Sequence, residues 1–78
     1  MDGQVSEARE IEIRGDSIRL GQLLKLSGIV DSGGELKGLL ATERVLVNGE
    51  PDARRGRQLH HGDVVVLGDH ELHVATGR

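Results

Sequence analysis

The chain has 78 residues, no cysteine, no aromatic residue and a formal net charge of −3 at pH 7. This length allows one domain at most, and without cysteine neither a disulfide nor a thiolate-bound metal can stabilise it. The lack of aromatic rings excludes RNA-recognition motifs and single-strand stacking platforms, because both contact bases through aromatic faces.

The N-terminal part is polar and acidic. Residues 1–8 show no apolar period and predict a flexible tail. Residues 9–14 alternate, with Ile11 and Ile13 on one face, which predicts a half-buried edge strand. Because this part has neither a basic segment nor an apolar run, we expect no signal peptide or membrane span, and a cytoplasmic location.

Two short helices follow. The first is predicted over residues 18–26, with Asp16 or Ser17 capping its start. Ser32 and Glu35 predict the start of the second helix, because they form a capping box in which the Glu35 carboxylate should turn back to the Ser32 N–H. Both have leucines at the i, i+3, i+4 spacing of a buried face: Leu20, Leu23 and Leu24, then Leu36, Leu39 and Leu40.

The C-terminal half has the pattern of short strands joined by tight turns. Val45–Val47 predicts a strand, and Asn48-Gly49 a tight reversal, because both residues tolerate positive φ. Further extended stretches and turns are predicted at 55–59, 60–63, 64–67, 68–69 and 70–75. The expected fold class is α+β, with two short helices packed on a small, largely antiparallel β-sheet.

The start of the second helix is one candidate phosphate site. Ser32, Gly33 and Gly34 would point backbone N–H groups outward at the positive end of the helix dipole. The alternative is that Ser32 only caps the helix and the glycines only shape the loop.

A second candidate is the arginine cluster of Arg54, Arg55 and Arg57, whose guanidinium groups match phosphate oxygens. In an extended segment Arg55 and Arg57 would share a face and Arg54 would point away. The alternative is a solvated loop whose charge serves solubility.

Other cations could extend this surface, namely Lys25, Lys37 and Arg44. Arg19 and Lys25 both fall on the first predicted helix, so they diverge by roughly 120° and cannot both address one row of phosphates. Of these two, Lys25 is the expected phosphate contact.

An ordered set of short motifs resembles the S-four-type RNA-binding domain, also called the alpha-L motif. The resemblance covers residues 19–66 and is strongest to short bacterial members that contain little else. The motifs are Arg19-Leu20, Leu23-Leu24, Gly28-Ile29, Asp31-Ser32, Glu35-Leu36-Lys37, Leu39-Leu40, Val45, Val47-Asn48-Gly49, Leu59 and Gly62-Asp63-Val64.

The resemblance implies binding of structured RNA by the two-helix face and the adjoining loop. The residues that would face RNA are Lys25, Ser32, Gly33, Gly34, Lys37, Arg44, Arg54, Arg55 and Arg57. The chain departs from the family pattern at three positions. Gly33 replaces a frequently basic residue, which should weaken affinity, Glu43 stands at a helix end where glycine is usual and should strain a left-handed backbone, and His61 replaces proline.

The function expected from the sequence is a non-catalytic RNA-binding module. A single domain, residues 9–76 with the motif core at 19–66, would recognise ribosomal or transfer RNA through backbone phosphates and shape. Its partners would be structured RNA and a ribosomal subunit or ribonucleoprotein, without a membrane, cofactor, metal or small-molecule substrate, and the protein would act as a monomer. The acidic N-terminal strand could instead recruit it through another protein.

Two other functional classes stay open. Residues 45–74 could suit a protein-interaction or carrier module, either forkhead-associated-like or sulfur-carrier-like, although the upstream Gly-Arg and Ser-x-x-His and a terminal Gly-Gly are missing. The third class is a metal-dependent enzyme, since imidazoles are metal ligands. Its candidate ligands, His60, His61, His70 and His73, are better explained as surface residues at hairpin ends.

Overall fold

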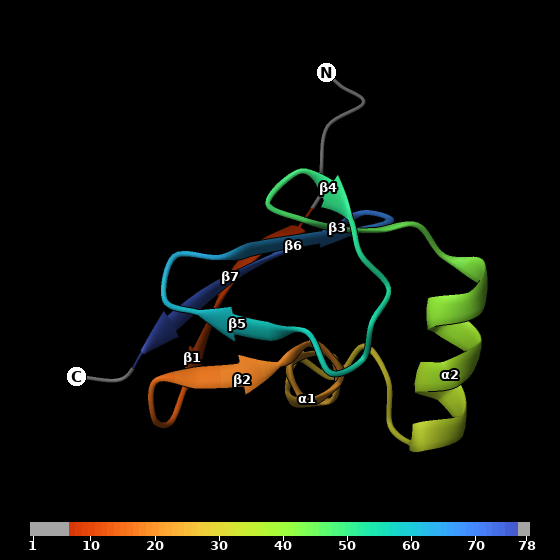
Figure 1. Cartoon of the computed structure of the whole chain (residues 1–78), viewed down its shortest axis with the longest axis horizontal. Coiled ribbons are helices and arrows are strands. Elements are labelled where there is room, and N and C mark those ends of the chain that lie inside the picture. Colours follow the sequence, from red (N-terminus) through yellow and green to blue (C-terminus); the bar gives the residue numbers. More distant parts are fainter. Residues whose placement is uncertain (1–6, 77–78) are drawn as a thin grey trace.

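The computed structural model describes residues 7–76, which form a mixed five-stranded sheet, a two-stranded sheet and two helices (Figure 1). The larger sheet has the order β1-β7-β6-β3-β4, in which β1 and β7 are parallel and the other neighbouring strands are antiparallel. Its strands are β1 (Glu7–Ile13), β3 (Val45–Val47), β4 (Glu50–Pro51), β6 (Val64–Leu67) and β7 (His70–Thr76). The predicted α+β class is confirmed.

Strand β1 lies at the edge of this sheet, as predicted, and pairs with β7 from Glu7↔His70 to Ile13↔Thr76. It begins earlier than expected. The predicted tail, residues 1–8, falls outside the described residues except for its last two, which belong to β1.

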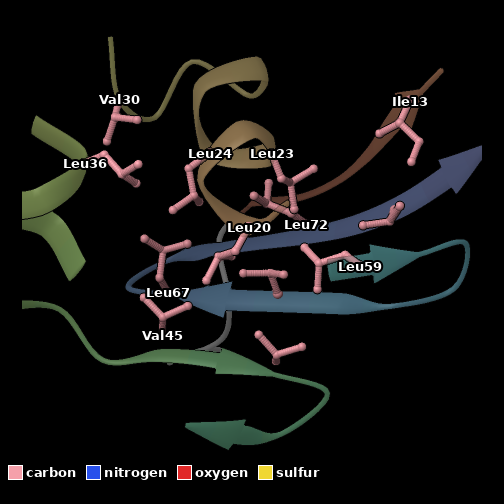
Figure 2. Close-up of a cluster of buried hydrophobic side chains, with 13 residues drawn as sticks. Ile13, Leu20, Leu23, Leu24, Val30, Leu36, Val45, Leu59, Leu67 and Leu72 are labelled. Atoms are coloured by element: carbon pink, nitrogen blue, oxygen red, sulfur yellow. The ribbon is translucent and has the colours of Figure 1, made fainter. Parts of the chain in front are cut away.

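The helices α1 (Leu20–Leu26) and α2 (Gly33–Thr42) supply four buried leucines to the core. Figure 2 shows Leu20, Leu23 and Leu24 between α1 and the strands, with Leu36 of α2 beside them. The predicted leucine spacing is confirmed for these four residues, while Leu39 and Leu40 are only partly buried. The strands complete the core with Ile13, Val45, Val47, Leu59, Val65, Leu67, Leu72 and Val74.

The predicted start of the first helix is wrong. Ser17–Arg19 form strand β2, which pairs with β5 (Gln58–His60), so α1 begins only at Leu20. Neither Asp16 nor Ser17 caps it. The Leu20 N–H donates to the Arg57 carbonyl over 2.8 Å and the Gly21 N–H to the Arg55 carbonyl over 2.9 Å. Residues 54–57, which we call the arginine segment, therefore provide backbone carbonyls that accept hydrogen bonds from the first N–H groups of α1.

The capping box at α2 is confirmed in part. The Ser32 Oγ accepts from the Glu35 N–H over 3.2 Å, but Glu35 Oε1 accepts from the Asp31 N–H over 2.7 Å, not from Ser32 as predicted. The strain expected at Glu43 is absent, because Glu43 has an extended backbone with φ −99°.

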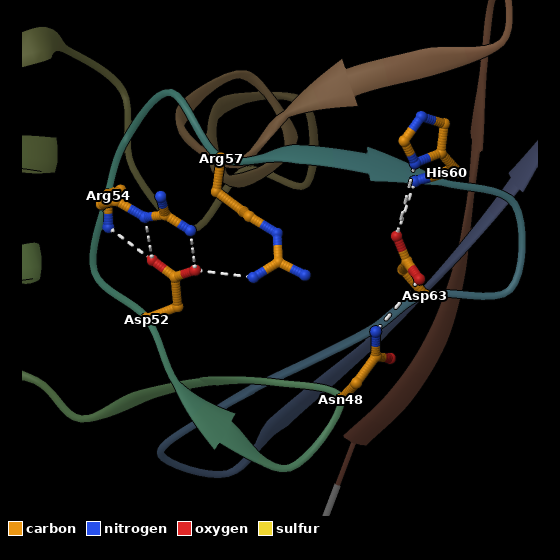
Figure 3. Close-up of polar contacts among 6 residues, drawn as sticks. All are labelled: Asn48, Asp52, Arg54, Arg57, His60 and Asp63. Atoms are coloured by element: carbon orange, nitrogen blue, oxygen red, sulfur yellow. Dashed lines mark hydrogen bonds and ion pairs between the residues drawn. The ribbon is translucent and has the colours of Figure 1, made fainter.

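The predicted Asn48-Gly49 turn is confirmed, with φ 53° and 87°. The Asn48 side chain joins this turn to the start of β6: its Oδ1 accepts from the Val64 N–H over 2.9 Å, and its Nδ2 donates to Asp63 over 3.1 Å. Asp63 also accepts from the His60 N–H over 2.7 Å (Figure 3). Across residues 7–76 neither helix has the length and apolar character needed to cross a membrane.

Candidate nucleic-acid interface

Three cations surround one groove of about 400 Å³ where β2, α1 and the arginine segment meet. We call it the cationic groove. It is lined by Arg19, Gly21, Gln22, Lys25, Leu36, Arg55 and Gly56. Arg19, Lys25 and Arg55 are exposed, and within residues 7–76 their side chains form no ion pair. Free cations converging on a polar hollow are suited to an anion.

The prediction that Arg19 and Lys25 cannot serve the same site is wrong. It assumed that both residues lie on one helix, whereas Arg19 is the N-cap of α1, with φ −82° and ψ 150°. Because the backbone of Arg19 is extended, the 100° rotation per residue of a helix does not set the direction of its side chain. The side chain lines the groove together with Lys25. Sequence reasoning missed Arg19 and Gln22 as candidate site residues. The position of Arg19 follows from the long-range pairing of β2 with β5, and Gln22 lies on α1 one turn before Lys25.

The arginine segment is a turn, not an extended strand. The Arg57 N–H donates to the Arg54 carbonyl over 3.0 Å. As a result Arg54 and Arg57 converge on Asp52, whereas Arg55 stands apart in the cationic groove, which is the reverse of the predicted grouping. Figure 3 shows both guanidinium groups beside the Asp52 carboxylate, where the Arg54 Nη2 and the Arg57 Nη1 donate to the same oxygen, Oδ2.

Asp52 is the centre of this turn. Arg54 donates from its Nη2 over 2.8 Å, its Nε over 3.0 Å and its backbone N–H over 3.1 Å, and the Arg57 Nη1 donates over 2.6 Å. The Arg54 side chain, the Arg54 backbone and the Arg57 side chain, in this order, hold the pKa of Asp52 far below its usual range. Asp52 in turn raises the pKa of Arg54.

The Asp52 contacts also act on the groove. The Asp52 side chain is 9% exposed, and it fixes the turn whose carbonyls cap α1. Arg55 lies in the sequence between Arg54 and Arg57, the two arginines bound to Asp52, and its carbonyl accepts a hydrogen bond from the Gly21 N–H over 2.9 Å. Asp52 therefore holds the backbone of Arg55 in place without touching its guanidinium group.

The start of α2 lies outside the cationic groove. Ser32, Gly33, Gly34 and Lys37 are exposed, but among the described residues of α2 only Leu36 lines the cationic groove. The Ser32 hydroxyl is engaged with Glu35, and the Glu35 carboxylate lies at this helix end and opposes an anion. Arg44 follows the opposite end of α2, about 15 Å away along the helix axis.

The second acidic centre, Asp63, has a structural role. Burial acts to raise its pKa, but hydrogen bonds from the His60 N–H and the Asn48 amide, with the charges of His60 and Arg57, lower the pKa of Asp63 overall. The histidines do not build a metal site within the described part of the chain, since it has no group of three or more His, Asp or Glu side chains placed to hold an ion.

Comparison with known proteins places this geometry in a family. The family model of the S4 domain matches residues 11–75, so the chain belongs to the S4 domain family, whose members typically bind RNA. The resemblance seen in the sequence is thereby confirmed. A relative from Bacillus subtilis (strain 168), described as "Probable ribosome maturation protein RlbA", is 53% identical over 60 residues, covering 77% of this chain and 84% of the relative.

Proposed function

We propose that the protein is a non-catalytic RNA-binding module that holds structured RNA, ribosomal or transfer RNA, by its backbone phosphates and shape. The observation that supports it most is the convergence of Arg19, Lys25 and Arg55, free of ion pairs in the described residues, on one groove of an S4 domain. Guanidinium groups bind phosphate oxygens in pairs, and the lysine adds a mobile charge.

The chemistry of the groove sets the expected affinity and its salt dependence. The three cations would engage about three phosphates, because Arg54 and Arg57 share the Asp52 carboxylate. Counterion release then gives a slope of log K against log salt of roughly −2 to −3. The chain has no aromatic side chain to stack a base on.

The partner we propose is a ribosomal subunit or its precursor. This rests on the description of the Bacillus subtilis relative as a ribosome maturation protein. Residues 9–76 would act as one RNA-binding unit and as a monomer, in the cytoplasm and without a cofactor.

The test is titration of the purified protein with fluorescently labelled ribosomal RNA hairpins at several salt concentrations. Replacing two of the three groove cations in Lys25→Gln/Arg55→Gln should weaken binding about 30-fold and reduce the magnitude of the salt slope by about two. The matched control Lys37→Gln/Arg44→Gln removes the same charge outside the groove. Equal losses in both variants would mean that only net charge matters, and undetectable binding by the unaltered protein at low salt would refute the proposal.

A further inference from the structure

A second groove, of about 560 Å³, lies beside the cationic groove. It runs between the end of β1, strand β2 and α1, and we call it the apolar groove. Its apolar lining consists of Ile13, Ile18 and Leu26, and its polar lining includes the amides of Gln22 and Gln58. Of the three cations proposed to contact phosphates, only Arg19 also lines it.

Leu26 makes this groove unusual. Its side chain is 56% exposed, and it is the exposed large hydrophobic residue of the described part of the chain. Leucines 20, 23 and 24 of the same helix are fully buried, so α1 has no packing need for another leucine on its outer face. A large apolar side chain left in water beside a hollow is suited to contact with a ligand.

The two grooves form one continuous surface. Both are lined by Arg19 and Gln22. A smaller hollow between them is lined by Ile18, Gln22, Lys25 and Leu26. Gln22, Lys25 and Leu26 follow the i, i+3, i+4 spacing, so an amide, a cation and an apolar side chain are neighbours on one face of α1.

We propose that the apolar groove holds an unpaired nucleobase of the RNA whose phosphates lie in the cationic groove. The inference rests on the proposed function and names the kind of RNA it requires. A base has two apolar faces, which Ile18 and Leu26 can contact, and a polar edge. The amides of Gln22 and Gln58 each offer a donor and an acceptor for such an edge.

The charge around the groove favours this occupant. Arg14 and Arg19 outnumber Glu12 along its lining, so the hollow has a net positive rim that continues into the cationic groove. A nucleotide joins an apolar base to a phosphate within one unit, which matches an apolar hollow adjoining free cations.

The proposal selects RNA with a bulge or loop over continuous duplex. In a duplex the faces of each base are stacked and its edge is paired, so neither can reach Leu26 or the glutamines. An unpaired nucleotide can turn its base outward while its neighbours stay helical. The preference would come from contact with aliphatic side chains instead of aromatic stacking.

The experiment uses two RNA hairpins that differ in one position. One has a single unpaired adenosine in its stem, and the other has an abasic residue there, which removes the base and keeps the backbone. The unaltered protein should bind the adenosine hairpin about fivefold more tightly than the abasic one, as expected for covering part of an apolar face. Leu26→Ser should bring this ratio close to one without changing affinity for the abasic hairpin.

The matched control is Ala41→Ser, which alters an exposed helical residue of α2 and should keep the fivefold ratio. Equal affinity of the unaltered protein for both hairpins, or a ratio that survives Leu26→Ser, would overturn the inference while leaving phosphate binding in place. A Leu26→Ser variant that kept the ratio but lost a protein partner on ribosomal particles would assign the groove to protein and overturn it too. Failure to bind either hairpin would instead refute the proposed function.

Discussion

At the scale of single residues, the most informative side chain is the carboxylate of Asp52, which lies among arginines. Asp52 accepts hydrogen bonds from Arg54 and Arg57, and it lies three residues before Arg55, which has no ion pair in the described part of the chain. Simple electrostatics would treat Asp52 as an obstacle to phosphate binding. The geometry gives it the opposite role, since it orders the turn that presents Arg55.

Asp52→Asn should therefore weaken RNA binding by about fivefold, although it removes a negative charge near the groove. Without the clamp, the turn must be ordered during binding, which costs about 0.5–1.5 kcal/mol for each immobilised side chain. Fluorescence anisotropy with a labelled hairpin measures the change.

The control for this prediction is Glu50→Gln, which removes an exposed carboxylate two residues away that has no hydrogen bond within the described residues. Its affinity should be equal or slightly higher. Tighter binding by Asp52→Asn as well would show that Asp52 acts only as a repelling charge.

At the scale of secondary-structure elements, the close approach of α1, α2 and the arginine turn depends on Gly21. A Cβ at this position would lie 2.8 Å from Leu36 Cδ2 and 3.4 Å from the Arg55 carbonyl oxygen. Leu36 is 1% exposed and cannot move into solvent. The missing side chain therefore sets the distance between the helices.

Gly21→Ala should lower the free energy of unfolding by about 1–2 kcal/mol, because overpacking against Leu36 exceeds the helix propensity gained from alanine. Gly38→Ala is the matched substitution within α2, where a Cβ meets nothing within 4 Å. It should raise the free energy of unfolding by about 0.5–1 kcal/mol. Urea denaturation of both variants tests the pair, and two changes of the same sign would contradict the packing argument.

The elements also show which structure can be predicted from sequence. Local signals were sufficient for α2, for the Asn48-Gly49 turn and for the hairpin of β6 and β7, because the residues that determine each lie within a few positions of one another. The start of α1 was mispredicted because its hydrogen-bond acceptors are the carbonyls of Arg55 and Arg57, more than thirty residues away. The same limit applied to the site, where the position of Arg19 depends on the long-range pairing of β2 with β5.

At the scale of the whole molecule, the two aspartates with lowered pKa values link stability to pH. An unfolded aspartate titrates near pH 3.9, and Asp52 and Asp63 titrate below their usual range in the folded protein. The folded state therefore binds fewer protons than the unfolded state under acidic conditions. The stability contributed by these groups is complete above about pH 4 and is lost as the pH falls toward the folded values.

We expect the free energy of unfolding to fall between about pH 4 and pH 2, and the fall to be shallower in Asp52→Asn and Asp63→Asn. Asp16→Asn alters an exposed aspartate without a hydrogen bond in the described residues, and it should leave the slope unchanged. Urea denaturation at a series of pH values measures these slopes. An unchanged slope in both test variants would show that other groups control acid unfolding.

The parallel pairing of β1 with β7 has a consequence for the order of events during synthesis. Ile11 and Ile13 belong to the first strand of the described residues, yet their partners in the sheet are Val74 and Thr76. While a ribosome builds the chain, β1 must wait until the polypeptide has been extended through residue 76 before it can join the sheet. Until then its apolar side chains stay uncovered, so the nascent chain completes this sheet late.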